Sequence, residues 1–459
     1  MAHASLVYRS AFVHGIWLCA FLAIGCGDAD PASTLVRVTP EPIGVHCSNG
    51  GVILEQGLDN NYDGVLGNDE VETREYVCSG EIGALRPDLC GDAIADQTVV
   101  IEGPADFAAL DGIACVNGSV LVVGTSLTDL GGLAGLRQIA GDLVVAANED
   151  LARLDGLGEL VLVNGNLILN SNLALEDLRP LGKLEGVFGA FQLRSLRALG
   201  NADGLDSLEE VRGGLEVVAN PALVDIDGLS ALKLVGGTVL VQFNGTLDHL
   251  SLSALGSTSG LHVFDNVGLR AIDMPVMEEI GGRGLRLRVN DQLGSVSLPL
   301  LNSASGATEI VDNQSLQSLS MPLLLSFGSR TDFIDNPSLD TLELGALFTV
   351  GGRLNITDLD ALEDFSGLGK LLVVSGPLDI RNNDALTDFR GLERLTTVSG
   401  SASIVGNPAL TTMSHLSSMT DITGNLTITN NASLPASDAA TFAGGVTVFG
   451  TTSIANNRP

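Results

Sequence analysis

An asparagine followed three residues later by leucine recurs along most of this chain, at intervals of about 24 residues. A fixed period of this length over some fifteen repeats indicates a solenoid, in which each repeat buries its apolar face only against its neighbours. The asparagines of this N-x-x-L motif are Asn148, Asn172, Asn220, Asn244, Asn266, Asn290, Asn313, Asn336, Asn383, Asn407, Asn431 and Asn457, and Gly124, Leu196 and Leu359 stand in the same slot of the remaining repeats.

Within one repeat, such as residues 127–148, Leu or Ile recurs every three residues and then alternates with other residues just before the asparagine. Alternation predicts a strand with one buried face, and the period of three describes bends that each send a side chain inward. Aromatic residues make up only 4% of the chain and glycine reaches 56 of 459 residues. The sequence therefore predicts a mainly β protein, a parallel β-solenoid of about fifteen turns of 23–24 residues.

The repeated asparagine must lie inside this stack, where an unpaired amide costs about 1 to 3 kcal/mol. Stacked coils avoid that cost if each amide bonds the backbone of the bend and the asparagine of the next coil. We therefore interpret these asparagines as a structural ladder.

The pattern L-x-x-L-x-G-L-x-x-L-x-x-V-x-G-x-L-x-I-x-x-N-x-x-L, over residues 89–459, resembles the receptor L-domain family. It is also similar to fungal cell-wall proteins, whose turns contain MP or LP pairs like Met274-Pro275, Leu298-Pro299 and Met321-Pro322 here. The resemblance implies a right-handed β-helix with a disulfide-stabilised N-terminal cap. Residues 436–445 depart from the repeat and are expected to form a closing helix.

The first 25 residues have the layout of an export signal, with Arg9 before an apolar run from Ala11 to Ile24, and Gly25 and Cys26 follow that run. The string LAIGC at residues 22–26 resembles the lipobox of bacterial lipoproteins, which implies that Cys26 is lipidated and anchors the protein in the cell envelope, at the outer membrane or cell surface. Plain signal cleavage and an uncleaved anchor are the alternatives. Residues 26–34 read as a tether.

A small module is expected at residues 35–80, followed by a linker at 81–89 and the solenoid at 90–459. The module contains an EF-hand-like loop, and it resembles a cysteine-containing repeat of exported myxobacterial proteins that ends in YVC-G. The loop pattern D-x-[DN]-x-[DN]-G-x5-E predicts calcium binding through oxygen ligands, since hard cations take six to eight of them. The predicted ligands are Asp59, Asn61, Asp63, the Val65 carbonyl and Glu70; the alternative is an acidic turn that binds no metal.

Four cysteines remain once Cys19 is assigned to the signal and Cys26 to the lipid. An even number in an exported chain indicates two disulfides, and four cysteines allow three pairings. Cys47 and Cys78 bracket the small module, while Cys90 and Cys115 bracket the start of the repeats. This placement favours the pairs 47 with 78 and 90 with 115.

The net charge of −32, from 23 basic and 55 acidic residues, excludes a nucleic-acid partner because it repels phosphates. Common nucleophile, zinc, nucleotide and dinucleotide motifs are absent from the sequence. We therefore expect no enzyme activity. One carbohydrate-active alternative uses Glu309 and Asp332, which project outward one coil apart, about 5 Å, and could serve as acid and base.

A basic stripe is expected on the outward positions of the strands that precede the asparagines. Arg194, His262, Arg286 and Arg288 fall on it, with Phe264 beside them, and basic residues aligned in an acidic chain indicate an anionic partner. Neutralisation by Glu216, Glu309 and Asp332 on neighbouring coils is the alternative. The hypothesis is a non-catalytic surface scaffold that binds a protein or glycan or mediates adhesion, with a structural envelope protein as the second reading.

Overall fold

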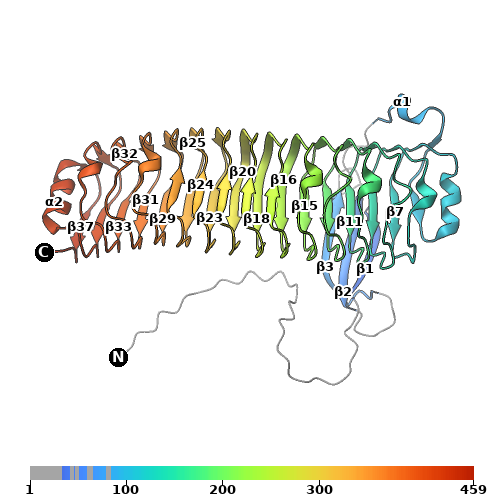
Figure 1. The fold of residues 1–459 in the computed structure, drawn as a ribbon, viewed down its shortest axis with the longest axis horizontal. Helices are drawn as coiled ribbons and strands as arrows, with labels where there is room; N and C mark the ends of the chain where they lie inside the picture. Colours follow the sequence, from blue (N-terminus) through green and yellow to red (C-terminus); the bar gives the residue numbers. More distant parts are fainter. Residues whose placement is uncertain (1–33, 42–45, 47–50, 59–65, 79–83) are drawn as a thin grey trace, which may run out of the picture.

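The computed structural model describes residues 34–41, 46, 51–58, 66–78 and 84–459. From residue 84 onward the chain winds into an elongated stack of parallel coils, and a three-stranded antiparallel sheet precedes it (Figure 1). The predicted mainly β fold, a parallel solenoid of about 15 turns with about 24 residues each, is confirmed.

Each coil contributes one short and one long strand, which pair in parallel with their counterparts in the neighbouring coils. The short-strand row contains β4 Ile94–Ala95, β6 Cys115–Val116, β8 Gln138–Ile139, β10 Leu162–Val163, β12 Gly186–Val187, β14 Glu210–Val211, β22 Ser303–Ala304, β25 Ser326–Phe327, β28 Thr349–Val350, β30 Val373–Val374, β32 Thr397–Val398, β34 Asp421–Ile422 and β36 Thr447–Val448. The long-strand row contains β5 Val99–Ile101, β7 Val120–Val123, β9 Leu143–Ala146, β11 Leu167–Asn170, β13 Phe191–Arg194, β15 Leu215–Val218, β23 Thr308–Val311, β26 Thr331–Ile334, β29 Leu354–Thr357, β31 Leu378–Arg381, β33 Ala402–Val405, β35 Leu426–Thr429 and β37 Thr452–Ala455. Three strands span both rows: β16 Leu234–Gln242, β18 Ser257–Phe264 and β20 Glu279–Arg288.

The third side of the coil changes along the solenoid. Five central coils form a third row of parallel strands, β17 His249–Ser251, β19 Ala271–Asp273, β21 Ser295–Ser297, β24 Ser318–Ser320 and β27 Thr341–Glu343. Other coils carry short 3-10 helices on this side, η2 Gly131–Leu133, η3 Arg179–Leu181, η4 Asp227–Leu229, η5 Ser366–Leu368 and η6 Ser414–Leu416, while η1 Pro104–Leu110 lies near the start.

The MP and LP pairs end these third-row strands. Met274 follows β19 directly, and its N–H still donates to the Ser297 carbonyl of the next coil, at 3.0 Å. Pro275 has no N–H to continue the ladder, so the strand stops there. The same reason applies to Pro299 and Pro322, which occupy the equivalent positions after β21 and β24.

Aliphatic side chains from all sides of the coil fill one continuous core. In β15, Leu215 and Val217 are fully buried and stand in register with Val239 and Val241 of the next coil. This stacking repeats along the solenoid because residues with the same place in the repeat share the same environment. The core is therefore mainly aliphatic, and five buried phenylalanines, Phe191, Phe327, Phe333, Phe365 and Phe389, take individual places in it.

The ladder asparagines are buried, except for half-buried Asn457, and their side-chain amides are hydrogen-bonded within the stack. Asn148, for example, donates from its backbone N–H and from Nδ2 to Oδ1 of Asn172, at 3.1 and 3.0 Å. Its Nδ2 also donates to the Val122 carbonyl at 3.0 Å. The expectation of a structural ladder is met, and at Leu196 and Leu359 the ladder lacks a side-chain acceptor.

One position in the repeat was assigned wrongly from the sequence. Thr125, not Gly124, occupies the asparagine slot, since its N–H and Oγ1 both donate to Asn148 Oδ1, at 2.9 and 2.8 Å. Gly124 takes the position directly before the slot, which is left-handed from this coil onward and has φ 65° at Gly124. Glycine suits that position because it has no Cβ to clash, and the short N-x-x-L motif does not distinguish it from its neighbour.

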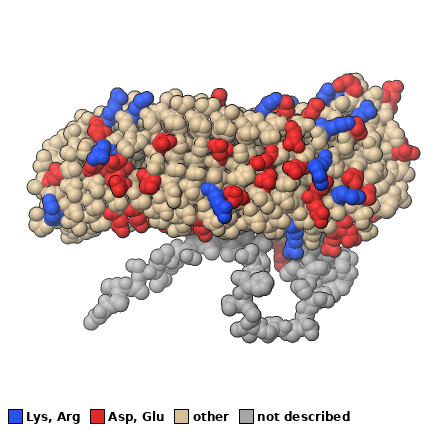
Figure 2. All heavy atoms as spheres, viewed as in Figure 1, with Lys and Arg blue, Asp and Glu red and all other residues tan. Residues whose placement is uncertain are grey.

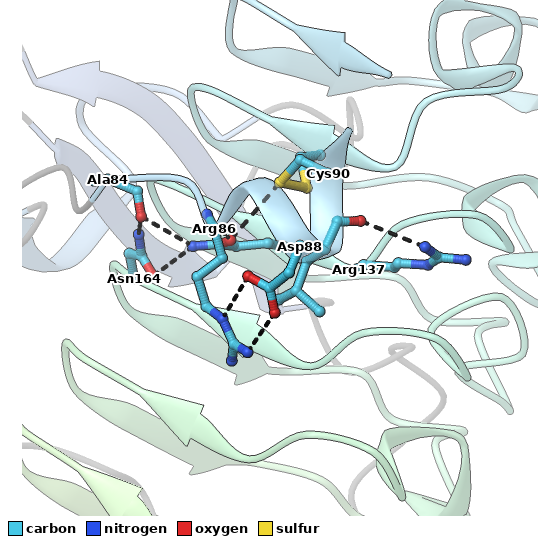
Figure 3. The surroundings of a disulfide bond; sticks show 9 residues. Ala84, Arg86, Asp88, Cys90, Arg137 and Asn164 are labelled. Carbon is cyan, nitrogen blue, oxygen red and sulfur yellow. Dashed lines mark hydrogen bonds and ion pairs between the residues drawn. A yellow bond between two sulfur atoms is a disulfide. The ribbon is translucent and has the colours of Figure 1, made fainter. Parts of the chain in front are cut away.

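A disulfide and a bound segment close the N-terminal end. Cys90 and Cys115 form the predicted disulfide, which joins α1 Pro87–Cys90 to the first coils. The Arg86 N–H donates to Gln138 Oε1 at 2.8 Å, and Gln138 Nε2 donates to the Ala84 carbonyl at 3.3 Å (Figure 3). Residues 84–90, expected to be mainly a linker, are thus bonded to the solenoid.

Helix α2 Ala436–Gly445 lies at the opposite end of the stack, where closure was predicted (Figure 1). Ala439 is fully buried, and Phe442 and Ala443 pack against the core. Asp438 Oδ2 accepts a hydrogen bond from the Met413 N–H at 2.8 Å, which ties the helix to the coil beneath it. The helix therefore covers apolar side chains that the last coils would otherwise expose.

The antiparallel sheet consists of β1 Thr34–Glu41, β2 Gly51–Leu58 and β3 Val71–Cys78, and Figure 1 draws it alongside the coils of β7 to β15. On those coils the outward positions of the long-strand row are apolar and buried: Leu121 is 6% exposed, and Val144, Ala146 and Ile168 are 0% exposed. Polar or half-exposed residues take these positions farther along the row.

Candidate functional site

The outward positions of the long-strand row lie in the predicted register. His262 and Phe264 of β18 pair with Arg286 and Arg288 of β20, and Arg286 pairs with Glu309 of β23. Glu309 pairs in turn with Asp332 of β26. Residues that are 22 to 24 positions apart in the sequence therefore lie one coil apart, because parallel strands stack in register.

Four arginines gather around the two carboxylates and a fifth, Arg283, lies beside His262, and we call these residues the arginine patch. It contains Arg283, Arg286, Arg288, Arg330 and Arg353 with Glu309 and Asp332. Five positive and two negative charges leave a local net charge of +3. Figure 2 shows that acidic side chains predominate over the visible face of the molecule, so this patch inverts the sign of a chain whose net charge is −32.

Glu309 is buried beneath the arginines, with its side chain 7% exposed. Arg330 Nη2 makes a close contact with Glu309 Oε1, and this hydrogen bond raises the pKa of Arg330. Arg286 Nε and Arg288 Nη1 lie farther from Glu309 Oε2, at 3.9 and 3.8 Å. Charge-assisted pairs bond at about 2.7 to 2.9 Å, so Glu309 is held mainly by Arg330.

Asp332, one coil further on, is likewise buried beneath an arginine side chain. Its Oδ1 accepts from Arg353 Nη2 at 2.6 Å and from Arg353 Nε at 3.2 Å, and its side chain is 5% exposed. Both carboxylates of the enzyme hypothesis are thus paired and lie under arginine side chains. A buried charge of this kind is stabilised by its partner, and removal of the partner is costly.

His262 and Phe264 form the aromatic border of the patch. Their ring centroids are 5.6 Å apart, and His262 Nε2 donates to the Arg283 carbonyl at 3.0 Å. Burial lowers the pKa of His262, and Arg286 adds to that effect. The histidine is therefore expected to present a neutral ring beside the arginines at neutral pH.

Arg194, the remaining predicted member of the stripe, lies apart. It belongs to β13, several coils before β20, and its Nη2 pairs with Glu216 Oε2 at 2.6 Å. Arg194 is thus neutralised by an acidic residue of the neighbouring coil, which was the alternative considered from the sequence. That alternative does not describe Arg286 and Arg288, since their nearest carboxylate is already engaged by Arg330.

Sequence reasoning missed Arg283, Arg330 and Arg353 because they lie in the bend just before the long strand. A signal for them exists: each follows a glycine or serine of a GGR or GSR string, with Arg330 and Arg353 at the same place in the repeat and Arg283 one residue earlier. Arginine side chains are long enough to reach from this bend over the outward positions of the next strand. The alternation of residues within a strand does not show that arginines of the preceding bend extend over it.

An acidic row borders the arginine patch at the other end of the strands. Asp265, Asp312, Asp335 and Asp358 occupy the left-handed position before the ladder asparagine, with φ between 54° and 59°. Burial and the neighbouring aspartates raise the pKa of Asp335, and burial raises the pKa of Asp265. Aspartate tolerates this backbone conformation better than most residues, so the row has a structural origin.

Two shallow grooves mark the ends of the third row. The groove beside β17 has a volume of about 420 Å³ and contains His249, whose Nε2 lies 3.1 Å from both carboxylate oxygens of Asp227. The groove beside β27 has a volume of about 300 Å³ and is lined by Asp340, Glu343, Asp364 and Ser366 among others. The second nitrogen of His249 faces Asp248 at 3.9 Å, so neither ring nitrogen is directed to a serine as a nucleophilic triad requires.

Most of the predicted calcium loop lies outside the described residues, including Asp59, Asn61, Asp63 and Val65. Glu70 is buried, and its Oε2 accepts the Gly67 N–H at 2.8 Å. Arg37 donates to the Leu66 carbonyl at 2.9 Å, so it ties β1 to the end of the loop.

Buried Glu55 accepts from Arg37 and from Arg74, each at 2.7 Å, and the Arg37 hydrogen bond lowers the pKa of Glu55. These ion pairs join all three strands of the small sheet. The predicted lipidation site Cys26 and the cysteine Cys47 lie outside the described residues, as does the side chain of Cys78 in β3.

Within residues 34–41, 46, 51–58, 66–78 and 84–459, no group of three or more His, Cys, Asp or Glu side chains is arranged to hold a metal ion. A search of the same residues for a helix both long and apolar enough to cross a membrane finds none.

The fold and the patch together define a class: a parallel β-solenoid with an elongated outer sheet and a cationic patch on it. Residues 33–78 match the model of a domain of unknown function, DUF7151, which coincides with the small N-terminal sheet. No curated protein matches the chain.

Proposed function

We propose that this protein is an exported, lipid-anchored surface scaffold that binds a ligand on the outer sheet of its solenoid without catalysing a reaction. The observation that carries the proposal is the local charge of +3 at the arginine patch within a chain of net charge −32. Like charges aligned on neighbouring coils repel one another, so their retention on a rigid face suits an anionic partner. The likeness to receptor L-domain proteins supports the same reading.

The envelope location rests on the sequence. The apolar run before Cys26 and the lipobox-like string support export and lipidation, and the EF-hand-like loop supports a calcium-stabilised module next to the anchor. In this proposal residues 26–34 tether the module, and the disulfide of Cys47 with Cys78 staples it. The small sheet and the bound segment 84–90 then hold the solenoid at a defined distance from the membrane.

The anchor has its own test. The change Cys26→Ser should abolish labelling by a radioactive or clickable fatty acid and release the protein into the soluble fraction. Unlabelled protein that still pellets with membranes would instead identify an uncleaved signal anchor.

A structural role in the envelope is the second candidate. The asparagine ladder and the continuous core favour it, because they make a stiff rod whether or not a ligand binds. A carbohydrate-active enzyme is less well supported, since Glu309 and Asp332 are each engaged by arginine and the grooves lie on another side of the coil.

The experiment that separates the first two candidates is capture of native cell-envelope components by the immobilised full chain. The double change Arg286→Ala with Arg288→Ala should weaken capture, and the loss should be greatest at low salt, because exposed charges are screened by ions. Arg381→Ala is the matched control: Arg381 lies on the same outer face, but it pairs with Asp379 at 2.9 Å. Capture that is unchanged in the double variant argues for the purely structural role.

A further inference from the structure

We propose that the ligand of the arginine patch is an acidic polysaccharide, whose carboxylate or sulfate groups meet the arginines while its chain runs along the solenoid axis. This inference rests on the proposed function and specifies its ligand. It follows from three properties of the patch: arginine hydrogen-bond donors without a carboxylate partner, the spacing of the arginines along the solenoid axis, and the residues that border the patch.

Three arginines retain hydrogen-bond donors for a ligand. Within the described part of the chain, no carboxylate oxygen lies within 3.5 Å of the guanidinium groups of Arg283, Arg286 and Arg288. Arg283 Nη1 reaches only Thr238 Oγ1, at 3.5 Å, and Arg286 Nε has no hydrogen-bond partner although little water reaches that atom. Guanidinium groups in this state bind carboxylate or sulfate with paired, charge-assisted hydrogen bonds.

The arginines of the bend form a row along the axis. Arg330 and Arg353 stand at equivalent positions one coil apart, and Arg283, offset by one residue, lies two coils before Arg330, so with about 4.8 Å per coil the three span roughly 14 Å along the axis. The small residue Ala307 occupies the bend between Arg283 and Arg330, which leaves the path along the row open. A linear polymer with regularly spaced acidic groups matches this geometry better than a compact anion, which would reach one or two arginines.

The borders of the patch favour a sugar chain over other polyanions. The acidic row repels an anion from the end of the strands, so the surface that attracts an anion is a narrow strip over the arginine patch. The paired rings of His262 and Phe264 stand one coil from Arg286 and Arg288 and offer flat apolar surface on which a sugar ring can pack.

A protein partner would need a larger apolar centre next to the arginines. Near the patch the large exposed apolar residue is Phe243, next to Phe264, while Leu300, Leu323, Leu325 and Phe348 lie between the third row and the short-strand row. Nucleic acid is opposed by the overall charge of −32.

The test measures binding of the full chain to defined polymers by calorimetry at low and at moderate salt. The probes are polygalacturonate for carboxylate, chondroitin sulfate for sulfate, uncharged dextran, polyglutamate and double-stranded DNA. We expect one or both acidic glycans to bind in a salt-dependent way, and dextran, polyglutamate and DNA to bind at least about tenfold more weakly.

Variants then locate the site. Arg286→Ala with Arg288→Ala should weaken glycan binding about tenfold or more, and Arg283→Ala should weaken it less, since each change removes one or two charge-assisted contacts. Phe264→Ala should weaken binding severalfold with the salt dependence preserved, because it removes apolar packing and no charge. Arg381→Ala should bind like the unmodified protein, and circular dichroism should show that all variants are folded.

The possible outcomes separate the two levels of the proposal. Polyglutamate that binds as tightly as the glycans, together with no effect of Phe264→Ala, overturns the inference of a sugar ligand. The inference of a sugar ligand is also overturned if glycans do not bind while envelope capture remains sensitive to the double arginine change. In that case the proposed function stands, but the ligand is another partner. If the double change affects neither measurement but alters the oligomeric state, both are wrong, and the patch joins copies of this chain.

Discussion

Asn244 and Asn266 are joined inside the solenoid although 22 residues separate them in the sequence: the backbone N–H and Nδ2 of Asn244 both donate to Oδ1 of Asn266, at 3.1 and 3.2 Å. Asn266 in turn donates to the Val241 carbonyl at 3.0 Å and to Asn290 at 3.2 Å. Asn266 Nδ2 also donates to the Phe264 carbonyl of its own coil at 2.9 Å, but the acceptor for Asn244 and most of the partners of each amide lie in the neighbouring coils. The ladder makes one coil depend on the next, which stiffens the face that carries the arginine patch.

The ladder predicts the cost of removing one amide. Asn266→Ala leaves the Asn244 N–H and Nδ2 without their acceptor, and we expect it to lower the free energy of unfolding by about 2 to 4 kcal/mol. Asn266→Leu should cost less, because Leu196 and Leu359 fill the same slot naturally without leaving a void. Urea unfolding followed by circular dichroism provides the comparison, and equal stability of Asn266→Ala and the unmodified chain would contradict a structural ladder.

The disulfide of Cys90 with Cys115 should stabilise the N-terminal end in particular. The cysteines are 25 residues apart, and closing a loop of that length is worth about 3.5 kcal/mol in the chain-entropy model. The double change Cys90→Ser with Cys115→Ser should therefore lower the melting temperature and open the first coils to protease. Mass spectrometry of early cleavage products locates the opening; initial cuts near α2 instead would show that the other end is the weaker one.

The acidic row predicts a pH effect of defined sign. Because the pKa of Asp335 is raised in the folded state, the folded protein holds that proton more tightly than the unfolded chain. The stabilisation by this proton is complete below the ordinary value of 3.8 and is lost as the pH rises through the higher folded value. Asp335→Asn should thus raise the melting temperature at pH 7 and have little effect at pH 3.5.

Asp340→Asn is the control for that experiment, since Asp340 lies outside the left-handed row. An equal gain in stability from both changes at pH 7 would attribute the effect to the reduced net charge of the chain, not to the row.

The calcium prediction concerns Glu70, whose carboxylate accepts the Gly67 N–H inside the small sheet. Calcium should raise the melting temperature of the full chain, since a cation that binds only the folded module stabilises it. Glu70→Gln should reduce that shift, because the bidentate ligand is weakened, whereas Asp69→Asn removes the same charge at a position that supplies no ligand in the loop pattern. No heat of binding in calorimetry with millimolar calcium would contradict the site.

We expect the small sheet to pack on the buried apolar patch of Leu121, Val144, Ala146 and Ile168, so that the module depends on the solenoid. Val144→Asp with Ile168→Asp places two charges on buried outward positions, which is costly without partners. We expect the sheet of β1 to β3 to become protease-sensitive while the circular dichroism of the solenoid changes little. The outward pair Leu240→Asp with Gln242→Asp, farther along the same row, is the matched control. If the first pair leaves proteolysis unchanged, the small sheet does not rely on this patch.

The sequence by itself determined the solenoid, its number of coils, the asparagine ladder, the closing helix and which outward residues stack on one another. These features follow from a repeat, because parallel strands in register place residues one period apart one coil apart, as with Arg286 and Glu309. The tertiary structure alone decided that Arg330 engages Glu309 closely while Arg286 and Arg288 stay 3.9 and 3.8 Å from it. The reason is physical: backbone stacking repeats with the sequence, whereas long side chains reach across coils to whichever carboxylate the packing brings nearest.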